Sequence, residues 1–346
     1  MIEYQIDSLS ISLDAFVSNS DKSYKYLFDN SIHIQLDVKD VLEAFYKKAM
    51  WDYPEKMGDY NICPEYGEAS RNYRFRFIVL KTDDDYVLVT FKIVDPRTVT
   101  IKNYFTVSYP PISYNGKSTE KVYDALKMYP DIKSIVGFST EDDFSNNNYY
   151  NMLKDFKEMD KSSWRSKRGV NRLRDLIEFD VESENIPNIE WHIEKLTNEW
   201  NKIKGKTSSV KSDLNLVGLA RRGDSVKVFS FWYKGVMVGF SIGIVIIDKY
   251  IGLITTKTVS IGDDAYLAEY LGESDMDLVK YMRKHIGSYV QYALHKYCLA
   301  DNNFEAVYYY GDTRSKTLRI FKKDYFKNII YYKRVPVRDG EVLSDD

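Results

Sequence analysis

Six cations lie within fourteen residues near the middle of the chain, with one tryptophan among them. The cations are Lys161, Arg165, Lys167, Arg168, Arg172 and Arg174, and the tryptophan is Trp164. Cations at this density can neutralise several phosphates, and an indole can stack on a base or a ribose. A charged helix that links two domains would have the same composition. The cluster therefore indicates either a contact with tRNA or DNA or a solvated linker.

A second basic segment could hold the phosphates of a cofactor. It contains Arg283, Lys284, Ile286, Gly287 and Ser288. If a helix begins near His285, the N–H groups of the last three residues are free to bind an anion, helped by the helix dipole and the two cations. The alternative is that Gly287 only relieves crowding where a long helix crosses a sheet.

A third group of residues follows an apolar stretch near the end of the chain. Tyr310, Gly311 and Asp312 are consecutive, and a glycine after a strand marks a sharp turn that can open a cleft. Asp312 could orient an amine or act as a general base, and Tyr310 could act as a general acid. The aspartate could equally be the N-cap of a following helix, and the tyrosine could line a core or cleft.

Other kinds of catalytic site find no support in the sequence. The four histidines, His33, His192, His285 and His295, have no metal-ligand spacing with carboxylates or cysteines, so no metal is expected. The sequence also lacks a glycine-rich nucleotide loop, a dinucleotide fingerprint and a GxSxG elbow. Metal-dependent, nucleotide-hydrolysing and serine-hydrolase chemistries are therefore not predicted.

The composition indicates a folded protein that does not insert into a membrane. The chain has 346 residues, of which 44% are hydrophobic and 29% charged, enough for two domains with cores of their own. Its net charge is −2, so a nucleic acid would need a local basic patch. Cys63 and Cys298 are far apart, which favours a cytoplasmic protein without disulfides. No signal peptide is evident, and the longest apolar stretch, near 236–247, is too short to cross a bilayer.

The 30 tyrosines have two explanations. Aromatic rings among cations can stack bases, but Lys, Asp, Asn and Ile are also plentiful. That combination is typical of an AT-rich coding sequence, and it would suit a bacteriophage or an AT-rich bacterium.

The hydrophobic spacing predicts a similar order of elements in each half of the chain. In the first half we expect helices over 38–51, 118–128 and 147–159, and strands over 73–80, 86–94, 98–107 and 132–138. In the second half we expect strands over 176–181, 226–233, 236–247, 250–259, 304–310 and 329–335, helices over 189–203, 276–299 and 314–323, and a polar loop over 204–213. Lys234 and Gly235 predict a tight hairpin. The helix over 276–299 predicts that the strands on either side of it pair in parallel.

This order of elements resembles that of the GNAT acyltransferase superfamily, and the second half resembles its FemAB-like and lysyltransferase-type branches. The matching segments begin at Ser166 with SKRGVNRLRDLIEFDVE, at Val228 with VFSFWYKGVMVGFSIGIVIIDKYIGLIT and at Val307 with VYYYGDTRSKTLRIFKKDYF. The resemblance covers about 162–335. It implies an α/β (α+β) fold of tandem GNAT-like domains, each a mixed, mostly antiparallel sheet flanked by helices. We expect an N-terminal GNAT-like domain over 1–160, a basic linker over 161–175 and an acyltransferase domain over 176–346.

The resemblance also implies a reaction. It is the transfer of an acyl or aminoacyl group from acyl-coenzyme A or aminoacyl-tRNA to an amine or hydroxyl acceptor, with Lys322 holding donor or acceptor. The basic residue and glycine pair that usually bind the coenzyme A pyrophosphate are not present in standard form, and Fem-type relatives, which use aminoacyl-tRNA, commonly lack them too. Two alternatives remain open: an acyltransferase that modifies nucleic acid held by the basic linker, and a non-catalytic interaction protein with the same fold.

Overall fold

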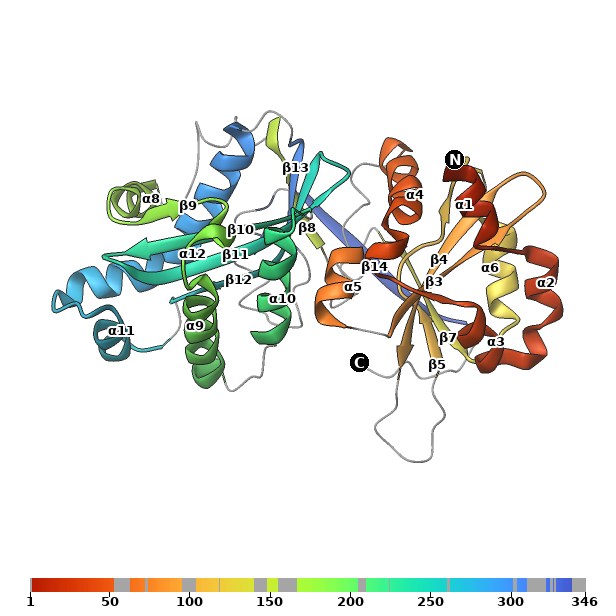
Figure 1. The fold of residues 1–346 in the computed structure, drawn as a ribbon, viewed down its shortest axis with the longest axis horizontal. Coiled ribbons are helices and arrows are strands. Elements are labelled where there is room, and N and C mark those ends of the chain that lie inside the picture. The colour runs from red at the N-terminus through yellow and green to blue at the C-terminus, as the bar shows by residue number, and fades with distance from the viewer. Residues whose placement is uncertain are drawn as a thin grey trace. The chain divides into compact units, whose positions relative to one another are not determined.

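The computed structural model describes most of the chain, which divides into two compact units. The described residues are 2–52, 63–71, 74–94, 104–117, 119–139, 148–154, 167–204, 210–223, 225–259, 262–300, 304–309, 322–323, 326 and 328–337. Unit 1 comprises Met1–Asn148, Gly311–Ser315 and Ile329–Asp346, and unit 2 comprises Tyr149–Tyr310 and Lys316–Asn328. Each unit has a sheet with helices packed against it (Figure 1).

Unit 1 is built on a mixed sheet with the strand order β1-β3-β4-β5-β7-β14. Its strands are β1 (Ser10–Ser12), β2 (Ile32–His33), β3 (Phe75–Lys81), β4 (Tyr86–Val94), β5 (Tyr104–Val107), β6 (Ile112–Ser113), β7 (Ile132–Ser139) and β14 (Asn328–Pro336). Its helices are α1 (Ile2–Ser8), α2 (Leu13–Ser18), α3 (Ser23–Asn30), α4 (Lys39–Asp52), α5 (Pro64–Ser70) and α6 (Glu120–Lys127), with short 3₁₀ helices at Ser20–Lys22 and Leu36–Val38. The β1–β3 and β5–β7 pairs are parallel, and the other pairs in unit 1 whose register is resolved are antiparallel.

The core of unit 1 lies between this sheet and the helices α2 and α6. Helix α6 contributes Val122, Ala125 and Leu126, whose spacing of three and four residues places them on one face. They pack in one cluster with Phe16 of α2 and with alternate side chains of the strands, such as Phe91 of β4. Burial of these apolar side chains is the main stabilising contribution in the unit.

Unit 2 is built on a sheet with the strand order β8-β13-β12-β11-β10-β9. Its strands are β8 (Asn148–Met152), β9 (Glu178–Asp180), β10 (Val226–Tyr233), β11 (Val236–Ile246), β12 (Tyr250–Thr258) and β13 (Ala306–Tyr309). Its helices are α8 (Lys167–Arg174), α9 (Ile189–Lys204), α10 (Val210–Arg221), α11 (Asp264–Leu271) and α12 (Met276–Ala300), with a 3₁₀ helix at Ser183–Asn185. Only the β12–β13 pair is parallel among these pairs. The predicted hairpin is present, because Lys234 and Gly235 have φ angles of 48° and 77°, as a type I′ turn requires.

Helices cover both faces of the sheet in unit 2. Gly239 of β11 faces α12, since a Cβ there would lie 3.5 Å from the Val290 side chain. On the other face, Lys257 of β12 reaches Asp213 of α10. Neighbouring side chains along a strand alternate between faces, so α12 and α10 lie on opposite sides of the sheet.

The structure confirms the predicted fold class and corrects three details. The segment 147–159 does not begin as a helix, because residues 148–152 form β8 and pair with β13. Helix α10 begins at Val210, inside the predicted polar loop. The boundaries also differ: residues 149–160 belong to unit 2 and residues 329–346 to unit 1. Strand β8, which lies in the predicted first domain, therefore belongs to unit 2, and β14, which lies in the predicted second domain, belongs to unit 1.

Candidate active site in unit 2

Within the described residues, the parallel pair β12–β13 ends next to a change of register in β12. The pair runs from Tyr250–Ala306 to Leu253–Tyr309, as the helical connection predicted. Next to the last pair, Ile254 of β12 is an extra residue that has no partner in β11, and such a bulge bends its strand. Strand β12 then continues to Thr258. Within the described residues, this stretch of β12 has no partner in β13.

Lys322 lies at the end of β13 and is completely buried. Its ammonium nitrogen is 4.3 Å from the ring centroid of Tyr309 and 5.4 Å from that of Tyr149. Tyr149 and Tyr309 are directly opposite each other in the β8–β13 pair, so their rings share one face of the sheet. A lysine without exposed surface is rare in proteins, and the aromatic faces stabilise its charge.

A line of hydroxyl groups connects Tyr309 to β12 and β11. The Thr256 hydroxyl hydrogen-bonds the Tyr309 phenol and lies 2.8 Å from the Ser241 hydroxyl. Burial raises the pKa of Tyr309, and the hydrogen bond from Thr256 offsets part of that rise. Tyr309 is therefore a neutral phenol near pH 7, able to donate a hydrogen bond.

Helix α12 adds a buried histidine beside this group. His295 has no exposed surface, and its ring centroid is 5.5 Å from that of Phe326, which in turn contacts Tyr309. Its Nδ1 lies 2.7 Å from the Gln291 carbonyl oxygen and must donate to it. Its Nε2 then accepts from the Asn151 amide at 3.0 Å. The histidine is thus a neutral neighbour of the site.

A buried ion pair lies on the opposite face of the sheet. Lys257 Nζ is 2.5 Å from Asp213 Oδ2, and both side chains are less than a tenth exposed. The same ammonium donates to Thr255 Oγ1 at 3.2 Å. Burial raises the pKa of Asp213, whereas the charge of Lys257 lowers it. The pair holds the part of β12 that follows the bulge against α10.

The predicted phosphate site at 286–288 lacks the free N–H groups that it needs. Helix α12 begins at Met276 and not near His285, and only the first four N–H groups of a helix are free. Ile286, Gly287 and Ser288 are mid-helix, and Ile286 and Ser288 are buried. At the real N-terminus, Asp275 accepts from the N–H groups of Asp277 and Leu278.

The two cations of the same prediction have different surroundings. Arg283 forms an ion pair with Asp264, at 3.0 Å, and donates to the Gly262 carbonyl. Lys284 is exposed. The carboxylate of Asp263 already caps α11, so both helices that follow β12 begin with an aspartate in the position where a phosphate would bind.

The basic cluster is partly helical and packs against α12. Helix α8 contains Lys167, Arg168, Arg172 and Arg174 and contacts α12. The Arg172 guanidinium is 4.6 Å from the Tyr281 ring centroid. Arg174 lies 3.6 Å from Asp175. Helix α8 therefore brings part of the first basic segment beside the second one.

Four predicted site residues lie outside the described residues, namely Arg165, Tyr310, Gly311 and Asp312. Within the described ranges, no group of three or more His, Cys, Asp or Glu side chains is placed to hold a metal ion. Among the helices of those ranges, none is long and apolar enough to cross a membrane. The sequence did not single out Thr256, Ser241 or Tyr149. The alternation of Tyr308, Tyr309 and Tyr310 along one strand was the available signal for Tyr309.

Several solved structures are similar to this chain. A conserved protein of unknown function from Bacteroides thetaiotaomicron is 13% identical and has a TM-score of 0.58, with 89% of this chain and 99% of that one covered. FemX is 9% identical and has a TM-score of 0.56, with 88% and 96% covered. A tandem GNAT protein from the clavulanic acid biosynthesis pathway is 10% identical, with a TM-score of 0.42 and 90% and 98% covered. Neither a protein-family profile nor a curated protein matches the sequence.

The likeness to FemX confirms the resemblance that the sequence predicted. The chain shares the fold of FemX, as the resemblance to the FemAB-like branch implied. At these identities the comparison shows the fold and not the activity, because one fold can support many functions.

Proposed function

We propose that the chain is an acyl- or aminoacyltransferase with its active site in unit 2, at the end of β13. The observation that carries the proposal is the bulge in β12 beside Tyr309 and the buried Lys322, where β12 continues past the last pair with β13 that the described residues show. If β12 and the chain after Tyr309 separate there, backbone N–H groups of β12 can polarise a carbonyl oxygen. The acceptor amine or hydroxyl attacks the carbonyl carbon and loses a proton. The bond from that carbon to the leaving oxygen or sulfur breaks, and the leaving atom takes up a proton.

The side chains around the opening suggest separate roles. The neutral phenol of Tyr309 can donate its proton toward the leaving atom, and Lys322 can hold a negative charge near the end of β13. Asp312 and Tyr310 remain candidates for orienting the acceptor, and Gly311 for giving it access. Holding the reactants together would supply much of the rate enhancement.

The starts of α11 and α12 favour an aminoacyl ester as the donor. Both helix N-termini already contact an aspartate carboxylate, Asp263 or Asp275. A second anion in the same position would be repelled, which disfavours the pyrophosphate of coenzyme A there. Arg283 and Lys284 could still contact donor phosphates through their side chains. We therefore expect aminoacyl-tRNA to be used more readily than acyl-coenzyme A.

The test compares the same substitution, lysine to methionine, at two adjacent positions. Lys322→Met replaces a buried ammonium with an apolar chain of similar length, whereas Lys323→Met alters the exposed next residue. Transfer from aminoacyl-tRNA or acetyl-coenzyme A to hydroxylamine, a small generic acceptor, gives a hydroxamate that can be measured. We expect Lys322→Met and Tyr309→Phe to lower the rate at least tenfold, with the melting temperature within a few degrees of the parent.

The outcomes separate the alternatives. Equal transfer rates for the Lys322→Met and Lys323→Met variants would show that the active site does not lie at the end of β13. No transfer and no binding with either donor would favour the non-catalytic interaction protein.

A second candidate is an acyltransferase that holds nucleic acid on helices α8 and α12. Arg172 lies on Tyr281, whose ring centroid is 4.6 Å from that of His285. Burial and the nearby charge of Lys284 lower the pKa of His285, which favours its neutral ring. Cations beside such rings are typical of surfaces that bind phosphates and stack bases.

Binding of a generic RNA oligonucleotide at several salt concentrations tests this surface. Replacing Arg172 and Arg174 by Ala should weaken binding and flatten the dependence of log K on log salt by about 0.7 per lost phosphate contact. Lys121→Ala, an exposed charge in unit 1, should leave the slope unchanged. An unaltered slope in the double variant would show that α8 is only a solvated surface.

A further inference from the structure

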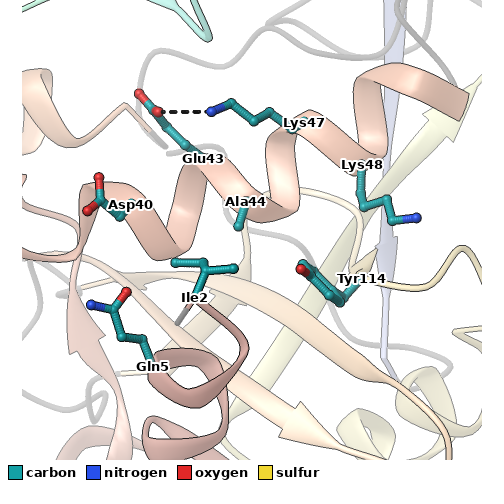
Figure 2. Close-up of a pocket in the computed structure, with 8 residues that line it drawn as sticks. All are labelled: Ile2, Gln5, Asp40, Glu43, Ala44, Lys47, Lys48 and Tyr114. Atoms are coloured by element: carbon teal, nitrogen blue, oxygen red, sulfur yellow. Dashed lines mark ion pairs between the residues drawn. The ribbon is translucent and has the colours of Figure 1, made fainter.

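Unit 1 has an open groove between α1 and α4 that is remote in sequence from the candidate active site. It has a volume of about 700 Å³. Its walls are formed by Ile2 and Gln5 of α1, by Tyr114, and by Asp40, Glu43, Ala44, Lys47 and Lys48 of α4. Figure 2 shows Asp40 and Gln5 toward one end, Lys48 and Tyr114 toward the other, and Ile2 and Ala44 between them. The groove is thus polar at both ends and apolar in the middle.

Opposite charges at the two ends come from one stripe of α4. Asp40, Ala44 and Lys48 are four residues apart, so they follow one side of the helix. Ala44 is the small member of the stripe and leaves the middle open. Within the described residues, neither Asp40 nor Lys48 has an ion-pair partner. By contrast, Glu43 already pairs with Lys47 at 3.9 Å and with Lys39 at 3.7 Å.

The length of the groove fits a short extended chain. Lys48 is eight positions after Asp40, which is about 12 Å along the helix axis. An extended peptide covers about 3.3–3.6 Å per residue, so three to four residues match this span. The Gln5 amide and the Tyr114 hydroxyl could hydrogen-bond the backbone of such a peptide. Tyr114 is held in place by an edge contact with Phe45, with the ring centroids 5.5 Å apart.

We propose that this groove binds a short zwitterionic peptide in extended form, with its amino group at Asp40 and its carboxylate at Lys48. The site is separate from the proposed transferase site, and the proposal does not depend on that function. Each end would contribute one exposed ion pair, which is a weak interaction. Binding should therefore be in the millimolar range, and specificity should come from the distance between the two charges.

Tetra-alanine is the probe, used with the full chain in an NMR titration. We expect shifts of signals from α1 and α4, and about fivefold weaker binding when the peptide is acetylated at its amino end or amidated at its carboxyl end. Lys48→Glu should weaken binding of the free peptide by at least the same factor. Lys121→Glu makes the same change of charge elsewhere on unit 1 and should have no effect.

Two further variants separate charge recognition from damage to the fold. The double variant Asp40→Lys, Lys48→Asp restores both charges in reversed order and should bind tetra-alanine about as well as the parent. Ala44→Leu fills the middle of the groove without changing charge and should abolish binding. Equal affinity for the free and doubly blocked peptides, no binding at all, or unchanged binding by the Ala44→Leu variant would overturn the proposal.

Discussion

His295 shows how a histidine that could be mistaken for a metal ligand is used as a neutral hydrogen-bonding group. Both ring nitrogens are already engaged, one by the Gln291 carbonyl and the other by the Asn151 amide. Burial is the main cause that lowers its pKa from 6.5 to about 4. The ring therefore stays uncharged in the folded protein throughout the neutral range.

This shift makes the stability of the protein depend on pH. In the unfolded chain His295 takes up a proton near pH 6.5, whereas in the folded chain it does so only near pH 4. The unfolded state thus binds more protons between these values, and the free energy of unfolding falls as the pH is lowered through this window, by up to about 3 kcal/mol. Urea unfolding at several pH values from 4 to 8 measures this change in the free energy of unfolding.

The variant His295→Gln isolates the contribution of this one side chain, because glutamine does not titrate. The difference in the free energy of unfolding between parent and variant should be largest above pH 7 and shrink toward pH 4. A difference that stays constant across this range would show that His295 does not titrate as described.

At this scale the sequence predicted some residues and not their partners. Lys322 was predicted through its match to the Fem-type lysine, and the structure shows that it is buried. The aromatic pair around it was not, because Tyr149 lay in a segment assigned to a helix. The ion pair between Asp213 and Lys257 joins residues 44 apart, and no local pattern relates them. Partners of this kind are determined by tertiary packing, which spacing along the chain does not encode.

Among the helices and strands, the long ones with a clear hydrophobic period were predicted well. The conformation of the short ones depends on the elements that pack beside them, so they were predicted less well. Strand β4 and helices α9 and α12 agree with their predicted ranges within a residue or two. Residues 148–152 were assigned to a helix because apolar side chains recur there at helical spacing. They form a strand because β13 offers them a ladder of hydrogen bonds. Tertiary context of this kind overrides local propensity.

The bulge in β12 gives a prediction at this scale. Gly243 of β11 pairs with Leu253 just before the bulge, and a Cβ at Gly243 would lie 2.8 Å from the Ile251 side chain. Gly243→Ala should therefore lower the free energy of unfolding by about 1–3 kcal/mol, because the packed side chains must shift. Thermal unfolding followed by circular dichroism measures the change.

Gly137 of β7 is the matched control for Gly243. It is also a strand glycine, and a Cβ there would meet nothing within 4 Å. Gly137→Ala should leave the melting temperature unchanged or raise it slightly. If the two variants behave alike, the crowding at Gly243 does not affect stability.

For the whole molecule, the exchange of β8 and β14 between the units predicts that the chain cannot be cut at residue 160, the predicted domain boundary, into two fragments that fold independently. A fragment of residues 1–160 lacks β14, which pairs with β7 from Ser134 to Ser139. We expect this fragment to show no cooperative thermal transition. Joining 328–346 to its end through a flexible linker should restore the transition, because the missing edge of the sheet is supplied. A fragment 1–160 that unfolds as cooperatively as the joined one would contradict this prediction.

The same exchange affects the order in which the protein can fold as it is synthesised. Strand β14, which pairs with β7, leaves the ribosome roughly 190 residues after β7 itself. At ordinary rates of translation this is a delay of about 10–40 seconds. During that time β7 has an open edge, which can pair with other chains. Unit 1 is therefore the first unit to be begun and the last to be completed, so a chain truncated before β14 would keep the edge of β7 unpaired even where the residues of unit 2 are all present.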